Sequence, residues 1–405
     1  MMINQIKQSW LTLGCLQLSG ALSLPVILIG YYLGQHGGTQ AALLQLGLGN
    51  AILFCLSAFY LAIIHPKKWV TIEFAQHLFG SAGTYICAVG MVLSLIGWSA
   101  IQINLIGLAI GHSTIFVNML MVLLIYAFTC RDLTYLATVN KLLLPIICLC
   151  FCYMLVSVPS NSFPHAPIAL DSFKIGLMMV ITAGSGLVFD LPTFYRHAAT
   201  PKDGLLGLIF IFGFALPLVE CAGIYLAKQS FLPVDYSDWM TNFINHFDLF
   251  SLFFLMLSGL LGTCLNLYSA GIIVSRTIKL SYQQSLLLCS VLAAMLSLIN
   301  LEKQFGFFLE IINLNAEIMT ALLFMYVMVR GRQLPMPDTR QKRLHQSIFY
   351  LVIFYAITSK FFQCNVLHDV FLETALLTCG LMMAGYGYFY FLSLKDTATY
   401  QGENT

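Results

Sequence analysis

The chain has 405 residues, of which 59% are hydrophobic and only 9% are charged, and its formal net charge is +2. About a quarter of the residues of an ordinary soluble domain are charged, so this composition excludes a soluble globular protein and indicates a polytopic membrane protein. A net charge this small gives no reason to expect nucleic acid or another acidic macromolecule as a partner.

Twelve apolar runs are long enough to cross the hydrocarbon core of a bilayer, which takes about 20 residues of helix. The segments between them are short, so the sequence predicts an all-α fold with a single transmembrane domain over residues 1–405. The predicted spans are 11–34, 41–64, 82–110, 114–130, 135–157, 173–190, 204–227, 248–275, 283–300, 305–329, 345–363 and 369–393.

The basic residues test this topology independently. With the N-terminus inside, 15 of the 19 Lys and Arg residues fall on the cytoplasmic side and 4 on the other. This bias follows the positive-inside rule and predicts that both termini are cytoplasmic.

The first span, Leu11–Gly34, contains residues that interrupt a helix near mid-depth. Its segment Ser19-Gly20-Ala21-Leu22-Ser23-Leu24-Pro25 includes a proline, which has no N–H and leaves the carbonyl of Ala21 without its helical donor. Irregular backbone at this depth is tolerated only where protein covers it or where it lines a wet cavity. Freed carbonyls suit a cation, and half-helix N-termini suit electron-rich substrate groups. A kink in a lipid-facing helix is the alternative.

The sixth span, 173–190, contains Ala183-Gly184-Ser185-Gly186, which predicts a second break. Paired breaks in corresponding spans are the best sequence indication of a transporter's binding site. The breaks lie five spans apart, an odd number, so a repeated five-span unit must be inverted in the membrane. We therefore expect inverted repeats at 11–157 and 173–329, followed by two appended helices within 345–393.

Trp98 lies in the middle of the third span, although tryptophan favours the membrane interface. An indole at mid-depth needs a partner for its N–H, and its flat face suits a planar heterocycle. Core packing is the alternative. Asn104, in the same span, is a candidate interhelical hydrogen-bonding residue. The predicted substrate-binding set is Ser19, Gly20, Ser23, Trp98, Asn104, Gly184, Ser185, Gly186 and Asn313.

The eighth span carries Thr263 and Asn266, three residues apart and hence on one helix face. Together with Gly20 and Ser23 they form a candidate cation site. A polar clasp between two helices is the alternative reading.

Ionisable residues within the hydrocarbon are functional candidates by default. Glu220 lies in the seventh span, and Glu310 and Glu317 lie in the tenth, where either could take part in proton coupling. A structural role is the alternative for each, with Glu310 near the outer interface and Glu220 paired with a neighbouring helix. Asp190 and Arg196 end the sixth span at the cytoplasmic face, where an acid and a base suggest a gate or a loop clasp. The candidates for gating or coupling are Asp190, Arg196, Glu220 and Glu317.

The sequence contains no nucleotide-binding loop, metalloprotease helix or nucleophile elbow, so we expect no enzyme activity and no ATP as energy source. Most of the twelve cysteines lie within apolar spans as small hydrophobes, which argues against disulfides and metal sites. The expected partners are a small-molecule substrate and the lipid bilayer, with no nucleic acid, and the expected state is a monomer. Na+ or H+ is the expected coupling ion, and no cofactor is expected.

Several stretches together resemble the cytosine permease branch of nucleobase:cation symporter family 1. They include Gly49-Asn50, the run Thr71–Gly83 leading to Gly97-Trp98, and the Pro145 span after Asn140-Lys141. The end of span 6 from Asp190 to Arg196 and the run Leu267–Gly271 complete the likeness.

The resemblance implies an inverted five-plus-five fold of the leucine-transporter type. It also implies a planar base stacked on Trp98 between spans 1, 3, 6, 8 and 10. Coupling to Na+ or H+ is implied too, with a sodium site of span 1 carbonyls and span 8 hydroxyls, in the inner membrane of a bacterium.

We therefore predict a secondary transporter that imports a nucleobase or a pyrimidine vitamin precursor by cation symport and alternating access. An amino-acid permease of the same fold is the first alternative, and a membrane-embedded enzyme or a passive channel is a second.

Overall fold

The computed structural model describes residues 7–36, 38–110, 115–157, 170–229 and 249–299, together with Phe308, Ile312, Ser347, Ile348 and Leu351. The chain divides into two compact units. The first is Met1–Thr71 with Gly90–Ile312, and the second is Ile72–Val89 with Asn313–Thr405. The contacts below are contacts within the first unit.

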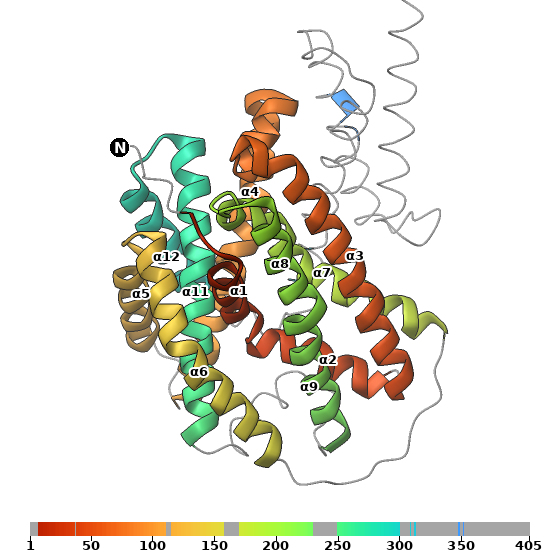
Figure 1. Cartoon of the computed structure of the whole chain (residues 1–405). Helices are drawn as coiled ribbons and strands as arrows, with labels where there is room; N and C mark the ends of the chain where they lie inside the picture. The colour runs from red at the N-terminus through yellow and green to blue at the C-terminus, as the bar shows by residue number, and fades with distance from the viewer. Residues whose placement is uncertain are drawn as a thin grey trace, which may run out of the picture. The chain divides into compact units, whose positions relative to one another are not determined.

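The described residues form helices, with one isolated parallel β-bridge between Gln8 and Ala198 (Figure 1). The helices are α1 (Trp10–Ala21), α2 (Leu24–His36), α3 (Gly38–Lys67), α4 (Thr71–Ala109), α5 (Ile115–Thr129), α6 (Leu133–Ser157), α7 (Leu170–Tyr195), α8 (Pro201–Phe210), the π-helical turn η1 (Ile211–Ala215), α9 (Leu216–Gln229), α11 (Leu249–Ile278) and α12 (Tyr282–Ser297).

The first nine predicted spans each coincide with helix. Among the described residues, six helices are long and apolar enough to cross a membrane, and the bent pair α1–α2 brings the number to seven. α5 and α12 are shorter apolar helices. The predicted spans 305–329, 345–363 and 369–393 lie outside the described residues apart from isolated positions, so the number twelve and the inverted repeat stay predictions.

Helix starts follow from local sequence. Thr200 ends an extended stretch, and its hydroxyl accepts the N–H of Asp203 at 3.0 Å while Pro201 occupies the first turn of α8. Ser281 and Gln284 form a capping box that starts α12. In α4, Gly80 adopts φ 66°, a left-handed conformation that favours glycine, and the straight apolar span is Gly83–Gly107.

The exposed face of α6 is that of a helix in lipid. Leu142, Leu149 and Val156 recur every seven residues and are 72%, 71% and 85% exposed. The opposite face of the helix carries Ile147 and Phe151, which are buried in an apolar cluster of the first unit. A stripe of exposed leucine and valine costs free energy in water but none in lipid, which fits a membrane-spanning helix.

The predicted break in the first span is confirmed. α1 ends at Ala21, α2 begins at Leu24, and their axes differ by 63°. α1 packs against α6, α8 and α11, whereas α2 packs chiefly against α9 (Figure 1). The two halves of this span therefore pack mainly against different helices, so α1 and α2 can move separately.

The predicted break in the sixth span is wrong. α7 is one continuous helix from Leu170 to Tyr195 and runs through Gly184, Ser185 and Gly186. A Cβ atom at Gly184 would overlap the side chain of Leu53 on α3, so this glycine provides close helix packing rather than a turn. The positions four residues before Gly184 and Leu53 also pack closely across the two helices. The three facing pairs are Gln45 with Gly176, Gly49 with Val180, and Leu53 with Gly184, with the first residue of each pair on α3 and the second on α7.

α2 and α9 cross with their backbones in contact. A Cβ atom at Gly30 would overlap the backbone carbonyl of Glu220, and one at Gly223 would overlap that of Ile27. Gly34 lies one turn after Gly30, so α2 carries a small-xxx-small stripe, the pattern that lets membrane helices approach closely. Of the helix pairs in the first unit, α2 and α9 have the most extensive contact.

Candidate functional site

The backbone between α1 and α2 leaves a carbonyl without its helical donor. Leu22 has φ −73° and ψ 61°, which is an inverse γ-turn, and the N–H of Ser23 donates to the carbonyl of Ala21 at 2.8 Å. In a continuous helix that N–H would bond to Ser19. The carbonyl released at the break is thus that of Ser19, not that of Ala21 as the position of Pro25 suggested.

Ser23 starts the second half of the span. Its carbonyl accepts the N–H groups of Val26 at 3.1 Å and Ile27 at 3.3 Å, and Pro25 occupies the first turn of α2. The break therefore presents the positive end of one half-helix beside a free carbonyl at the end of the other. Such a pair of ends can bind a polar solute group, an ion, or both.

Trp98 is the aromatic residue in the middle of the apolar part of α4. It packs against the apolar cluster that contains Leu22 and Leu24, the residues that flank Ser23. Its ring meets Phe308 edge-on, with centroids 5.2 Å apart and an interplanar angle of 84°. In an edge-to-face contact of this kind the planes of the two rings are nearly perpendicular. Trp98 is half-buried, as a residue of a binding site and a residue of the core both can be.

Gly186 of α7 is the predicted substrate residue that the structure brings to Trp98. A Cβ atom there would lie 3.9 Å from the indole Nε1, which is ordinary van der Waals contact. Gly184 instead faces α3. The hydroxyls of Ser19 and Ser185 donate to their own helices, to Leu16 at 2.7 Å and Thr182 at 2.6 Å. Asn104 is completely buried in α4.

Within the part of the chain that the structure describes, no hydrogen bond joins any two of the four residues of the candidate cation site. The hydroxyl of Thr263 donates to Oε1 of Gln102 at 2.9 Å, which is the interhelical clasp that stood as the alternative. Gly20 faces the methyl of Leu265, 4.0 Å from where its Cβ would lie, and Asn266 is half-buried. A sodium site of these four residues stays a prediction. Glu310, Asn313 and Glu317 lie outside the described residues.

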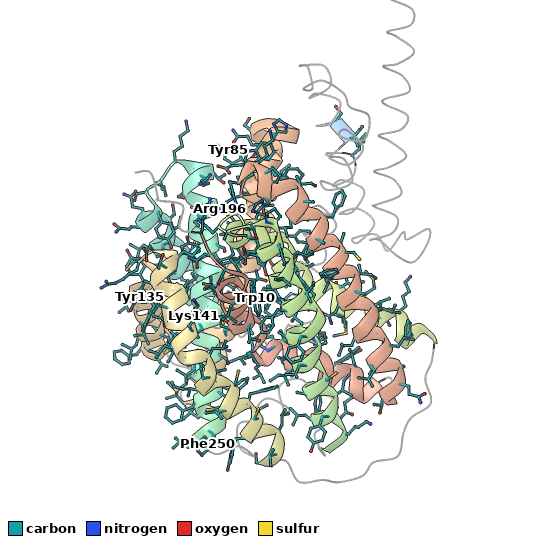
Figure 2. The ribbon with its side chains drawn as sticks, viewed as in Figure 1. Trp10, Tyr85, Tyr135, Lys141, Arg196 and Phe250 are labelled. Carbon is teal, nitrogen blue, oxygen red and sulfur yellow. The ribbon has the colours of Figure 1, made fainter. Side chains whose placement is uncertain are left out.

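Asp190 and Arg196 both contact α11. Oδ2 of Asp190 accepts the hydroxyl of Ser269 at 2.6 Å, and the Arg196 guanidinium bonds to the Tyr268 side chain. The ring of Phe194 stacks on Tyr268 at 6.0 Å. Arg196 and Phe250 lie toward opposite ends of the bundle in Figure 2, so these contacts join α7 to α11 at the end that lies away from Phe250. We call Asp190, Phe194, Arg196, Tyr268 and Ser269 the α7–α11 latch.

Ser269→Ala is expected to loosen this latch. A typical intramolecular hydrogen bond contributes about 0.5–1.5 kcal/mol, which corresponds to a roughly 2- to 10-fold change in the ratio of latched to unlatched protein. Spin labels at the exposed positions Lys202 and Lys279 would report the distance between the ends of α8 and α11, once the exposed Cys55 and Cys152 are replaced. A distance distribution identical to that of the unsubstituted latch would contradict the expectation.

The segment before α1 is bound to the turn that follows α7. The N–H of Gln8 donates to the carbonyl of His197 at 2.7 Å, and the N–H of Ala199 donates to the carbonyl of Gln8 at 2.9 Å. Lys68, after α3, donates to the carbonyl of Ala198 at 3.3 Å. The N–H of Trp10 donates to Asp203 at 3.2 Å. One turn thus joins the starts of α1 and α8 to the end of α3, and we call it the terminal strap.

The imidazole of His197 makes the terminal strap sensitive to acid. Burial lowers the pKa of His197 to about 4, and the neighbouring charges of Arg196 and Lys68 add to the effect. Nε2 of His197 accepts a hydrogen bond from Arg196 at 3.1 Å, which only the neutral ring can do. Between about pH 6.5 and pH 4 a released His197 binds a proton more readily than the packed one, so the strap loses stability as the pH falls through that window.

We therefore expect hydrogen exchange at the Gln8 and Ala199 amides to accelerate between pH 7 and pH 4.5, after correction for intrinsic exchange rates. A His197→Asn protein keeps a polar side chain without a titration and should show a flat profile. An equal acceleration in both proteins would show that another group is responsible.

Glu220, like Asp190 and Thr263, is a buried polar residue that bonds to a side chain of another helix. It is 3% exposed on α9, and Oε2 accepts Nδ2 of Asn50, on α3, at 2.6 Å. The pairing with a neighbouring helix that was left open in the sequence is thus present. Sequence reasoning missed Asn50 as a partner, and also Ser269, Tyr268, Gln102 and Phe308.

Solved transporter structures share this fold over nearly the whole chain. Mhp1, a nucleobase-cation-symport-1 family transporter in a closed conformation with bromovinylhydantoin bound, aligns with a TM-score of 0.71 at 13% identity, over 95% of this chain and 93% of that one. A Na+-coupled sialic acid symporter in a substrate-bound outward-open state gives 0.66 at 12%, over 94% and 89%. A manganese transporter from Eremococcus coleocola gives 0.54 at 13%, over 95% and 94%.

No protein-family model matches the sequence, and no curated protein matches it. The resemblance to nucleobase:cation symporters is confirmed in the fold, since Mhp1 also matches in an inward-facing conformation with a TM-score of 0.65. These solved structures that share the fold are transporters. Identities of 12–13% carry the fold alone, so substrate and ion have to be argued from this chain's own residues.

Proposed function

We propose that the protein is a secondary active transporter that imports a small planar nitrogenous solute, such as a nucleobase or a pyrimidine vitamin precursor, by cation symport. The observation that supports this most directly is that the broken span α1–α2 and Trp98 share one apolar cluster. Leu22 and Leu24, which flank Ser23 at the break, belong to the cluster against which the mid-depth indole packs. Polar ends recognise ring nitrogens and carbonyls, and the indole face stacks on the ring.

The shape around Trp98 favours a flat solute. Phe308 meets the indole by its edge, and Gly186 presents no side chain toward the indole nitrogen. Mhp1, with the same fold, was solved with a hydantoin bound, and a hydantoin is itself a planar nitrogen heterocycle. The likeness supports the class of solute without identifying it.

Alternating access needs two helix groups that separate at one end of the site at a time. The 63° break lets α1 move without α2, because they pack on different neighbours. In this proposal the α7–α11 latch, with Asp190 and Arg196, is the cytoplasmic gate. Substrate release to the cytoplasm requires it to open, and the terminal strap follows α1 as it moves. Both termini are cytoplasmic, in the inner membrane of a bacterium, and the protein works as a monomer.

Uptake into proteoliposomes tests the proposal. Purified protein should accumulate radiolabelled cytosine, uracil or hydroxymethylpyrimidine under an inward cation gradient, and an excess of the unlabelled compound should compete. Competition by amino acids alone would favour an amino-acid permease of the same fold and overturn the proposed substrate class. Uptake that ignores every imposed ion gradient would favour a passive channel.

A further inference from the structure

One buried carboxyl of the first unit has no part in the substrate site described above. Glu220 lies on α9 within the apolar span Pro201–Lys228 and is 3% exposed. A carboxyl at such a position is costly as an anion and is retained where it pairs or where it carries protons. The groups that surround it decide between these two roles.

Among the described residues, no cation pairs with Glu220. α9 packs against α1, α2, α3 and η1. Among the described residues of these elements, the side chain that bonds to the carboxyl is the amide of Asn50, and Cys221 is the titratable group that interacts with it electrostatically. These helices carry further titratable groups in their described parts. They are Cys15, Tyr31, Tyr32, Cys55, Tyr60, His65, Lys67, Tyr225 and Lys228.

Asn50 can serve both protonation states of Glu220. Its Nδ2 donates to Oε2 of Glu220 at 2.6 Å and to the carbonyl of Leu46 at 3.1 Å. Its Oδ1 is buried and accepts no hydrogen bond within the described residues. A carboxylate can only accept, whereas a carboxylic acid also donates an O–H. The amide nitrogen is therefore a partner for the carboxylate, and the idle amide oxygen is a partner for the acid.

Glu220 also touches the half-helix that forms the substrate site. Its backbone carbonyl fits against Gly30 of α2, at the crossing where no side chain intervenes. α2 begins at Leu24, six residues before Gly30, and Ser23 immediately precedes it at the break. If a change of charge at Glu220 alters the crossing of α9 and α2, the alteration therefore reaches the start of α2. This is the helix end that would bind the solute.

We propose that Glu220, with Asn50 as its hydrogen-bonding partner, is the proton-binding site that couples solute import to a proton gradient. The inference rests on the proposed transport function and names its coupling ion. In the outward-facing state the carboxylate takes one proton from the outer solution and becomes a neutral acid. In the inward-facing state the acid releases that proton to the cytoplasm, so one proton crosses with the solute and no other bond changes.

The first test uses the unaltered protein in proteoliposomes without Na+. An inward proton gradient should drive accumulation of the solute that the uptake screen identifies, and a pH-sensitive dye in the lumen should record acidification that depends on the solute. Accumulation that requires Na+ and ignores the proton gradient would overturn the inference. It would leave the proposed function intact, because the solute would still be imported.

The second test replaces the carboxyl. Glu220→Gln keeps the shape and an acceptor for Nδ2 of Asn50 but cannot exchange a proton. We expect it to lose accumulation driven by the proton gradient and to retain solute exchange across the membrane without a gradient. Glu220→Asp, which restores an acid, should recover part of the proton-driven accumulation. A purely structural carboxyl would show the reverse order, with Gln better tolerated than the shorter Asp.

Asp132→Asn is the matched control. Asp132 is an exposed carboxyl whose side chain accepts the N–H of Tyr135 at the start of α6, and asparagine caps a helix equally well. Its proton-driven accumulation should equal that of the unaltered protein. Proton-driven accumulation that survives in Glu220→Gln would refute the site. A protein that takes up none of the planar compounds in any variant or gradient would refute the proposed function itself.

Discussion

Gly30→Ala should lower the stability of the protein more than any alanine substitution at a glycine that faces only side chains. The new Cβ atom would overlap the carbonyl oxygen, carbonyl carbon and Cα of Glu220. These are backbone atoms and cannot rotate away, so α2 and α9 must separate along their most extensive contact. Overpacking costs about 1–3 kcal/mol and occasionally more, and the upper end corresponds to roughly 6–12 °C in Tm.

The buried cysteines provide the measurement. Cys150, Cys264 and Cys289 are buried free thiols, so a thiol-reactive fluorophore added during heating reports unfolding in detergent. Gly47→Ala is the control, because nothing lies within 4 Å of a Cβ atom there and alanine favours helix by about 0.5–1 kcal/mol. If the Gly30→Ala and Gly47→Ala proteins have the same Tm, the crossing of α2 and α9 is looser than the structure shows.

The break in the first span could be predicted because its cause is covalent. Pro25 has no N–H whatever surrounds it, and the structure places the break between Ala21 and Leu24. The identity of the released carbonyl could not be predicted in the same way. It depends on the inverse γ-turn at Leu22, which gives the Ser23 N–H to Ala21 and leaves Ser19.

The prediction at the sixth span failed because a glycine in a membrane helix has two uses. It permits a turn, and it permits a close approach of another helix. Which of these applies to Gly184 depends on Leu53, which faces it from α3 and which the local sequence does not reveal. The run from Gly30 to Gly34 is a recognisable close-packing motif, and it does mark the crossing with α9.

Sequence reasoning found the chemically unusual residues but not their partners. Asp190 was identified because it ends the sixth span together with Arg196, and Glu220 because ionisable residues are rare within the hydrocarbon. Thr263 was identified because it shares a helix face with Asn266. Their partners lie 79, 170 and 161 residues away in the chain, at Ser269, Asn50 and Gln102. No periodicity in a single sequence links positions so far apart. The terminal strap is of the same kind, because its bonds join the chain's first described residues to the turn after α7.

Trp98→Ala is expected to weaken substrate binding by roughly 10- to 100-fold, because stacking of a base on an aromatic side chain contributes about 1–3 kcal/mol. Trp98→Phe keeps a stacking face and should lose much less. Equilibrium binding of the radiolabelled solute to purified protein measures both. Trp10→Ala is the control, since Trp10 is 38% exposed at the start of α1 and meets Phe210 at 6.3 Å. Its loss should lower stability without changing Kd.

The two substitutions at Trp98 separate recognition by the ring face from recognition by the N–H. If both variants bind weakly, the indole N–H is required, and its closeness to Gly186 would place the solute against α7. If both bind normally while their Tm falls, Trp98 is a core residue held by Phe308, and the binding site has to be sought elsewhere along the broken span. Weak binding by the alanine variant alone leaves the ring face as the recognition element, because phenylalanine retains a face and lacks a donor.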